Sequence, residues 1–432
     1  MDKERRQLKA AFHTLGCKLN FSETSTIGKM LAERGVARAV GDERPDLIVV
    51  NTCSVTEMAD KKGRQLLRRL AREWPGATIV ATGCYAQLKP TEVAAIEGVD
   101  MVLGSNEKLL ITQFLDRWLA ERQQIVEVTP FTEIREFRPS CERGDRTRYF
   151  LKVQDGCDYF CTYCTIPYAR GRSRSGKIAD IVAIAEEAAA EGAKEIVITG
   201  VNIGDFGRDT GEKLLDLLKA LEGAEGVERY RISSIEPNLL TEEIIRWIAG
   251  ESHKFMPHFH IPLQSGSDAV LRLMNRRYDT ELFASRIEMI RRLIPDAFIG
   301  VDVIAGARGE TQEEWEHSYE FIRSLPVTRL HVFPYSERPG TKALSIGYNV
   351  DPHERHLRAA KLAALSDEKH AAFINSHIGE EASVLWEHPA HQDAPMHGFT
   401  ENYIRIEAPF DPEAINRVTG VTITAENLSK EQ

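Results

Sequence analysis

Three cysteines lie close together in the segment GCDYFCTYC, residues 156–164. Cys157, Cys161 and Cys164 have the spacing C-x3-C-x2-C, and no further cysteine follows them. Thiolates favour soft metals and iron–sulfur clusters, and a closed structural zinc site takes four ligands. Three cysteines on a four-iron cluster leave one iron open, where a small molecule can bind. We therefore expect a reactive iron–sulfur centre; the alternatives are a zinc site or an accidental group of cysteines.

Three further cysteines stand at the ends of segments that we expect to be buried parallel strands. The segments are residues 9–16, 46–53 and 78–85, and the cysteines are Cys17, Cys53 and Cys84. The carboxyl ends of parallel strands line one edge of a sheet, so these side chains could converge there. We expect a second three-cysteine site, with three separately buried cysteines as the alternative. Cys141 has no partner cysteine nearby in the sequence and is expected to be inert.

The composition is typical of a soluble globular protein. The chain has 432 residues, of which 42% are hydrophobic and 28% charged. No apolar run approaches the roughly 20 residues of a membrane span. The charged start MDKERRQLKA lacks an apolar signal segment, so we expect a cytoplasmic location, where thiols stay reduced. The net charge of −10 argues mildly against a large phosphate-binding surface.

Apolar segments alternate with helical ones through most of the chain, which favours an α/β fold with parallel sheets. Residues 1–130 should form an open parallel-sheet domain. Residues 131–147 are charged and aperiodic, and we interpret them as a linker. Residues 148–376 contain six more strand–helix units, which predict a partial TIM-like (β/α)6 barrel with a trailing helix. Residues 377–432 have short alternating strands, typical of a small β-barrel.

The six expected barrel strands place the 156–164 segment where chemistry is found in such barrels. They are residues 149–154, 194–201, 229–236, 258–265, 297–306 and 329–336. Reactive groups of these barrels sit at the carboxyl ends of strands, and Cys157 follows the end of the first one. His258 and His260 alternate along the fourth strand and are expected to be structural.

Six motifs carry a resemblance to a known family. They are TLGCKLN, VVNTCSVT, ATGCYAQ, GCDYFCTYCTIPYARGRSRS, LQSGSD and FPYSERPGT, in this order along the chain. Together they resemble the methylthiotransferase family of radical S-adenosylmethionine enzymes over nearly the whole length. The resemblance implies an N-terminal cluster domain, a radical barrel and a C-terminal TRAM domain. The implied activity is replacement of C–H by C–S–CH3.

The resemblance implies two 4Fe-4S clusters and S-adenosylmethionine as cofactors. The cluster on the 156–164 segment would chelate S-adenosylmethionine and cleave it to a 5′-deoxyadenosyl radical. The cluster on Cys17, Cys53 and Cys84 would carry the sulfur. Tyr163 is the aromatic residue between the last two cysteines of the radical signature. The other residues expected to bind this cofactor lie at the carboxyl ends of expected barrel strands: Thr199, Gly200, Glu236 and Gln264.

The family has branches that differ in substrate. TLGCKLN, CTYCTIPYARGRSRS and HFHIPLQSGSDAVLRLMNRRYD most resemble the branch for threonylcarbamoyladenosine in tRNA. The branch for isopentenyladenosine in tRNA more often has Gln-Met after the first cysteine, and the branch for a ribosomal-protein aspartate more often has Ser-Lys. The implied partners are the tRNA anticodon loop and an electron donor such as flavodoxin or ferredoxin, with no membrane and no DNA. An alternative of another class is a non-catalytic iron–sulfur or zinc RNA-binding protein.

Two features depart from the family pattern. GARGE at residues 306–310 stands where Gly-Phe-Pro-Gly-Glu is usual, although both glycines and the glutamate remain. Residues 377–432 carry ten acidic residues against three Lys and Arg, which opposes contact with phosphates. We therefore expect tRNA to be held by the basic segment 61–72 and by arginines after Cys164. The expected tRNA-binding residues are Arg64, Arg68, Arg170, Arg172 and Arg174.

Overall fold

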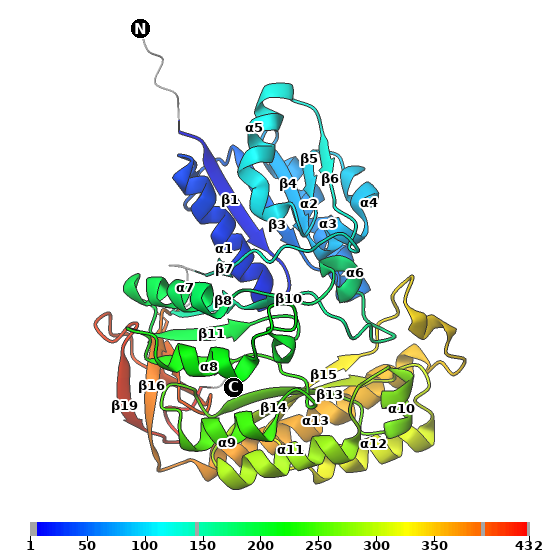
Figure 1. The fold of residues 1–432 in the computed structure, drawn as a ribbon, viewed down its shortest axis with the longest axis vertical. Helices are drawn as coiled ribbons and strands as arrows, with labels where there is room; N and C mark the ends of the chain where they lie inside the picture. Colours follow the sequence, from blue (N-terminus) through cyan, green and yellow to red (C-terminus); the bar gives the residue numbers. More distant parts are fainter. Residues whose placement is uncertain (1–6, 143–146, 390–393, 430–432) are drawn as a thin grey trace.

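The computed structural model describes residues 7–142, 147–389 and 394–429 and arranges them in three packed regions (Figure 1). The N-terminal strands are β1 (Lys9–Thr14), β2 (Ala37–Arg38), β3 (Leu47–Thr52), β4 (Thr78–Gly83), β5 (Val99–Leu103) and β6 (Ile125–Glu127). The helices of this region are α1 (Lys18–Glu33), α2 (Glu57–Glu73), α3 (Cys84–Leu88), α4 (Pro90–Ala94), η1 (Lys108–Leu110) and α5 (Ile111–Glu121). The strands form one parallel sheet in the order β2-β1-β3-β4-β5-β6, as predicted.

Both faces of this sheet are covered. Leu31 of α1 and Trp118 of α5 belong to the apolar cluster on one face, and Leu67 of α2 and Val93 of α4 to the cluster on the other. β3 and β4 are buried along their whole length, and both contain a continuous apolar run, residues 47–50 in β3 and 79–81 in β4.

The central region is an arc of six parallel strands. They are β8 (Arg148–Lys152), β11 (Glu195–Thr199), β12 (Arg229–Ile232), β13 (His258–Gln264), β14 (Phe298–Ala305) and β15 (Arg329–Pro334). Hydrogen bonds join β12-β11-β8 in one sheet and β13-β14-β15 in another. Isolated parallel bridges, Tyr230 with Phe255 and Ser234 with His260, continue the arc between the two sheets. The expected partial barrel and its six strands are thus confirmed.

Helices cover the outside of the arc (Figure 1). They are α7 (Ile178–Ala190), α8 (Leu214–Glu222), α9 (Glu242–Gly250), α10 (Asp268–Leu273), α11 (Thr280–Leu293), α12 (Gln312–Ser324) and α13 (Pro352–Ser376); short elements between strands are β9 (Gln154–Asp155), α6 (Ile166–Arg170), β10 (Arg174–Ser175), η2 (Ile203–Asp205) and η3 (Lys342–Ser345). Side-chain caps fix several starts: Thr241, Asp279 and Thr311 each accept a hydrogen bond from a backbone N–H in the first helical turn. The segment GARGE, residues 306–310, forms a turn before α12, in which Gly306 and Gly309 both have positive φ.

The segment expected to be a linker contains a strand. β7 (Ser140–Cys141) pairs antiparallel with β8 and extends the barrel sheet. The hydroxyl of Ser140 hydrogen-bonds that of Ser22 on α1 at 2.7 Å. The linker prediction is therefore wrong for these residues, because backbone pairing with an edge strand requires no sequence periodicity. Positions 143–146 of the predicted linker lie outside the described residues.

The C-terminal region is an antiparallel sheet in the order β18-β17-β16-β19. Its strands are β16 (Glu381–Glu387), β17 (Met396–Phe399), β18 (Arg405–Ala408) and β19 (Val418–Thr422). Its core continues into the barrel, because Phe298 of β14 and Phe373 of α13 pack in the same apolar cluster as Trp386. Arg231 of β12 donates to the backbone carbonyls of Thr400 and Glu401 at 2.7 Å each. The acidic region is thus anchored on the barrel.

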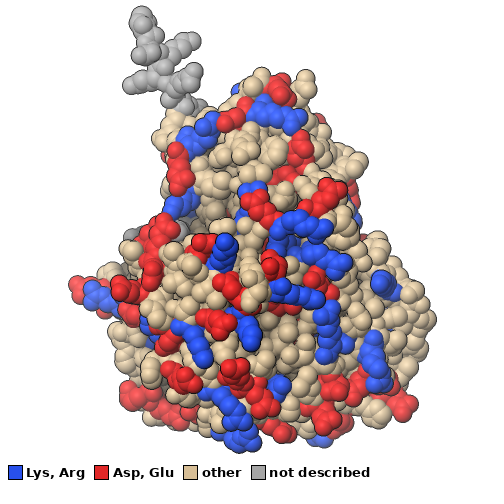
Figure 2. Space-filling model, viewed as in Figure 1, with Lys and Arg blue, Asp and Glu red and all other residues tan. Residues whose placement is uncertain are grey.

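The described helices include none that is both long and apolar enough to cross a membrane. Figure 2 shows acidic and basic side chains mixed over most of one face, with basic side chains gathering where the N-terminal region meets the barrel.

Candidate active site between the two cysteine sets

The N-terminal cysteines lie at one edge of the sheet. Cys17 is the N-cap of α1, Cys53 directly follows β3, and Cys84 is the first residue of α3 after β4. All three line a cavity of about 720 Å³. Gly16 has φ +104°, and a Cβ at that position would lie 2.9 Å from the Cys53 sulfur, so only glycine leaves room for this approach. The structure therefore brings the three cysteines together.

The second set occupies the loop after β9. Backbone N–H groups point at two of its sulfurs: Tyr159 N–H to Cys157 at 3.5 Å and Ile166 N–H to Cys164 at 3.4 Å. The guanidinium of Arg276 donates to the sulfur of Cys161 at 3.2 Å. Burial raises the pKa of the Cys157 thiol to about 12, whereas donors of this kind favour the thiolate that binds metal. The loop thus presents three sulfurs with hydrogen-bond donors in place.

The two sets are neighbours. Thr165, which follows Cys164, donates its hydroxyl to the carbonyl of Ser54, which follows Cys53, at 3.3 Å. The helices α3 and α6, which begin at Cys84 and close behind Cys164, pack against each other. The candidate active site therefore lies at the contact between the N-terminal sheet and the barrel.

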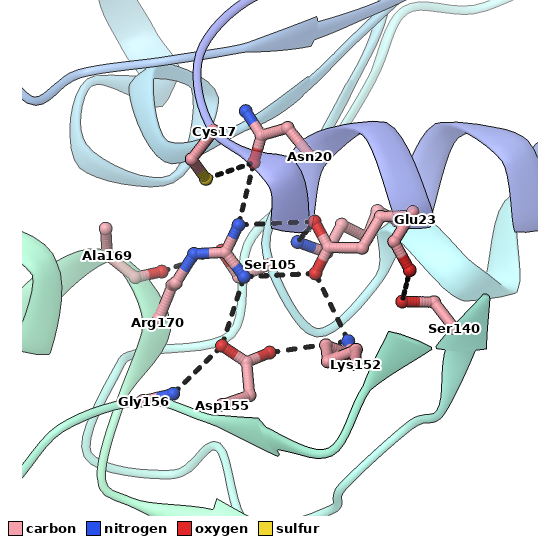
Figure 3. A network of polar contacts seen from close by, with 12 residues as sticks. Cys17, Asn20, Glu23, Ser105, Ser140, Lys152, Asp155, Gly156, Ala169 and Arg170 are labelled. Atoms are coloured by element: carbon pink, nitrogen blue, oxygen red, sulfur yellow. Dashed lines mark hydrogen bonds and ion pairs between the residues drawn. The ribbon is translucent and has the colours of Figure 1, made fainter. Parts of the chain in front are cut away.

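A buried network of charges supports this contact (Figure 3). Arg170, only 1% exposed, donates to Glu23 and Asp155 at 3.0 Å and to the side-chain oxygen of Asn20 at 2.7 Å. Asn20 in turn donates to the carbonyls of Leu15 and Thr52, which come shortly before Cys17 and Cys53 in the chain. Burial opposes ionisation of Glu23, but Arg170 and its neighbours hold the pKa of that carboxyl below its usual value. One arginine thus ties α1 to the barrel beside Cys17.

This network corrects two predictions about tRNA binding. Arg170 is enclosed by carboxylates, and Arg174 is 5% exposed and pairs with Asp155 at 3.2 Å, so neither is placed to reach a phosphate. Their spacing in the sequence could not reveal this, because the acidic partners come from other elements. Arg172, between them, has a side chain that is 56% exposed.

The basic segment 61–72 is helical as predicted, within α2. Arg68 is exposed, whereas Arg64 pairs with Glu92 at 2.9 Å and with the hydroxyl of Tyr85. The sequence analysis missed Arg208 and Arg277, two exposed arginines beside the cysteine loop: Arg208 pairs with Asp158, and Arg277 lies over the ring of Tyr159 at 4.1 Å. The exposed arginines Arg172, Arg208 and Arg277 therefore lie beside the cysteine loop, whereas Arg68 lines a separate surface cavity with Gly98, just before β5.

Three of the five residues predicted to bind S-adenosylmethionine line the cavity or contact Arg276. Thr199 and Gly200 line the cavity, and the buried hydroxyl of Thr199 has no hydrogen-bond partner in the described structure. Glu236 instead bonds Arg276, which lies against Cys161. Burial raises the pKa of Glu236, and Arg276 opposes that rise.

The other two predicted residues are held by the backbone and by packing. Gln264 ends β13 at a β-bulge with φ +70°, a conformation that is uncommon for a residue other than glycine. Tyr163 packs against the apolar cluster of Val270, Met274 and Ala307. None of these contacts tests cofactor binding, which stays a prediction for Tyr163, Thr199, Gly200, Glu236 and Gln264.

Arg276 is the clearest residue that sequence reasoning missed, although it lies within the motif MNRRY. Its guanidinium also donates to Tyr278, whose hydroxyl bonds the carbonyl of Pro262 at 2.7 Å. Arg276 thus connects the cysteine loop to β13. Its position inside a quoted motif was the available signal, but the sequence alone does not say which of the two adjacent arginines points inward.

The described residues include no group of three His, Cys, Asp or Glu side chains that converges on a single metal ion. A four-iron cluster spreads its thiolates more widely than one ion does, so this finding does not oppose a cluster. Both cysteine sets fit a four-iron cluster. Each supplies three thiols, and thiolates are soft ligands that suit iron–sulfur chemistry.

Proteins of similar sequence are consistent with this geometry. Residues 151–322 match the Radical SAM superfamily, and residues 9–104 match the Uncharacterized protein family UPF0004. Threonylcarbamoyladenosine tRNA methylthiotransferase MtaB of Bacillus subtilis (strain 168) is 38% identical over 420 residues, which cover 96% of this chain and 93% of that relative. tRNA-2-methylthio-N(6)-dimethylallyladenosine synthase of Syntrophomonas wolfei is 34% identical over 84% of this chain and 82% of that relative.

A solved structure shares the fold. The radical S-adenosylmethionine methyltransferase TsrM from Kitasatospora setae, with cobalamin and a 4Fe-4S cluster bound, has a TM-score of 0.58 and 16% identity, covering 78% of this chain and 77% of that one. The likeness shows the arrangement of sheet domain and barrel. Given the extent of the sequence match and the two cysteine sets around one contact, the chain belongs to the radical S-adenosylmethionine methylthiotransferases.

Proposed function

We propose that this chain is a tRNA methylthiotransferase that replaces C2–H by C2–SCH3 on N6-threonylcarbamoyladenosine next to the anticodon. The observation that carries the proposal is the junction of two three-cysteine sets, linked from Thr165 to Ser54, in a chain 38% identical to a relative named for this substrate. The relative named for dimethylallyladenosine is less similar and covers less of the chain, which favours the first substrate.

Two 4Fe-4S clusters and S-adenosylmethionine would supply the radical and the sulfur. Cys157, Cys161 and Cys164 would hold one cluster, and Cys17, Cys53 and Cys84 the other. Thr199, Gly200, Glu236, Gln264 and Tyr163 would bind or flank the adenosylmethionine. The guanidinium of Arg276 donates to the Cys161 sulfur, and its positive charge favours the thiolate form of Cys161.

In this proposal each region of the chain has its own role. Residues 1–130 carry the sulfur-delivering site, residues 148–376 the radical site, and the antiparallel sheet of 377–432 is a TRAM-like β-barrel. The exposed arginines around the cysteine loop would hold the anticodon loop, with an electron donor such as flavodoxin or ferredoxin as the second partner. A tRNA substrate places the reaction in the cytoplasm.

The test is nucleoside mass spectrometry of tRNA from a strain that lacks the gene. We expect the methylthio form of threonylcarbamoyladenosine to disappear while its unmodified precursor accumulates. The wild-type chain should restore it, and Cys161→Ala should not. Loss of a methylthio group from isopentenyladenosine, or from a ribosomal protein, would move the proposal to that substrate.

A further inference from the structure

Lys18 directly follows Cys17 and is the first residue of α1. It lines the 720 Å³ cavity and a second cavity of about 480 Å³ that shares His258, Asp302 and Tyr403 with the first. In the described part of the chain Lys18 forms no ion pair or hydrogen bond with its side chain. An ammonium group that is partly withdrawn from water without a counter-ion is unfavourable, so a ligand anion would stabilise it.

The other cations around the main cavity are already neutralised. Arg148 pairs with Glu387 at 2.5 Å, and Arg231 pairs with Glu195 at 2.7 Å. The remaining arginine, Arg170, is held by Glu23 and Asp155. The carboxylate of Asp302 accepts from His260 at 2.7 Å. Lys18 is therefore the cation of this cavity that remains available to a ligand.

Another part of the cavity wall is aromatic and polar. Tyr403, from the C-terminal region, stacks on Phe399 at 4.7 Å between ring centroids and lies 4.7 Å from the His258 ring. It has φ +70°, a strained conformation for tyrosine, which its contacts with the barrel hold in place. His258 is 8% exposed and Ser233 6%, and His258 Nδ1 and Ser233 Oγ are buried without a partner in the described structure. Both residues line the cavity, so their unused hydrogen-bonding capacity lies in its wall.

We propose that Lys18 binds the carboxylate of the threonyl group, with His258, Ser233 and Tyr403 forming the wall for the rest of the substituent. This rests on the proposed substrate, threonylcarbamoyladenosine, whose N6 substituent ends in a carboxylate. The N6 group and C2 flank the same ring nitrogen of adenine. A carboxylate held next to Cys17 therefore keeps the C2 edge toward the cysteine sets. The N-terminus of α1, which begins at Lys18, adds a favourable dipole for the same anion.

The test uses two anticodon stem-loop RNAs that are identical except that the threonyl carboxyl is free in one and a methyl ester in the other. Equilibrium binding to the reconstituted enzyme is measured by fluorescence anisotropy, and methylthio formation by mass spectrometry. We expect the wild type to prefer the free acid by about tenfold or more, the scale of one charge-assisted hydrogen bond. Lys18→Met should remove this preference by weakening binding of the acid while leaving the ester unchanged.

Two further variants keep the result interpretable. Lys29→Met alters an exposed lysine of the same helix that pairs with Glu187 and Glu191, and it should behave like the wild type. Lys18→Arg keeps the charge and should retain the preference for the acid. The ratio of the two RNAs is measured on one protein sample, so a change in cluster content next to Cys17 does not alter the comparison.

The outcomes separate the two proposals. If the wild type thiolates the acid RNA and Lys18→Met retains the full acid preference, the assignment of Lys18 is wrong and the proposed function stands. If the wild type thiolates neither RNA under conditions where it cleaves S-adenosylmethionine, the proposed substrate itself fails.

Discussion

The cysteines of the 156–164 loop come from one short stretch, whereas Cys17, Cys53 and Cys84 come from three elements of the N-terminal sheet. The loop set is organised by local backbone donors and by Arg276. The N-terminal set depends on strand register, on Gly16 and on a buried ion network that crosses to the barrel. The first site is therefore mostly local, whereas the second is assembled by one sheet edge and is braced by contacts with the barrel. This difference predicts distinct responses to substitution.

The largest expected effect separates the roles of the two sets. Cys161→Ala should abolish reductive cleavage of S-adenosylmethionine, because it removes a ligand of the radical cluster. Cys53→Ala should leave formation of 5′-deoxyadenosine largely intact and stop methylthiolation. Both products are measured by liquid chromatography and mass spectrometry on anaerobically reconstituted protein. Equal loss of cleavage in both variants, with the loop cluster still assembled, would falsify this division of labour.

The next effect tests the dependence of the N-terminal set on docking. Arg170→Met leaves Glu23 and Asp155 buried without their main partner, which should destabilise the protein by about 3–5 kcal/mol. Iron should be lost mainly from the N-terminal set, leaving roughly half of the total. Iron assay and thermal unfolding measure the two effects. Arg172→Met, whose side chain is 56% exposed, is the matched control and should change neither.

The same variant has a predictable pH dependence. The pKa of Glu23 is lowered in the folded protein, so its pairing stabilises the fold above the unfolded-state value near 4.5, and this contribution declines as pH falls below that value. The difference in Tm between wild type and Arg170→Met should therefore be larger at pH 7 than at pH 4. A difference that does not change with pH would show that the network acts through packing alone.

A smaller effect concerns RNA binding around the loop. Arg172→Glu with Arg208→Glu should weaken tRNA binding about tenfold and reduce the slope of log K against log salt by roughly 0.7 to 0.9 for each lost phosphate contact. Filter binding across a salt series measures both quantities. Arg246→Glu with Arg323→Glu alters exposed arginines on α9 and α12 and serves as the control. If the control pair weakens binding equally, the effect is one of net charge, and the arginines beside the loop have no special role.

The smallest effect is expected at the seventh cysteine. Cys141 is 4% exposed, its thiol contacts the carbonyl of Glu142, and it does not line the cavity of Cys17, Cys53 and Cys84. Cys141→Ser should leave iron content and activity unchanged and shift stability by about 1 kcal/mol or less. A fall in iron content after this change would show that Cys141 contributes to one of the two cysteine sets.

The features that depend on neighbouring residues could be predicted from the sequence. The spacing of Cys157, Cys161 and Cys164, the alternation of apolar strands and helices, and the run of motifs indicated the radical barrel, because each depends on residues close together in the chain. The convergence of Cys17, Cys53 and Cys84 was also predictable, since the carboxyl ends of parallel strands meet at one edge.

Which charged residues are buried and paired could not be predicted from the sequence. Arg170 and Arg172 are two positions apart, yet one is buried between Glu23 and Asp155 and the other is exposed. Lys18 and Tyr403 are far apart in sequence but line the same cavity. The acidic C-terminal region supplies that tyrosine and is docked through Arg231, which its composition could not reveal. The physical reason is that charge pairing and cavity walls are set by contacts between distant segments, and these follow from docking rather than from local periodicity.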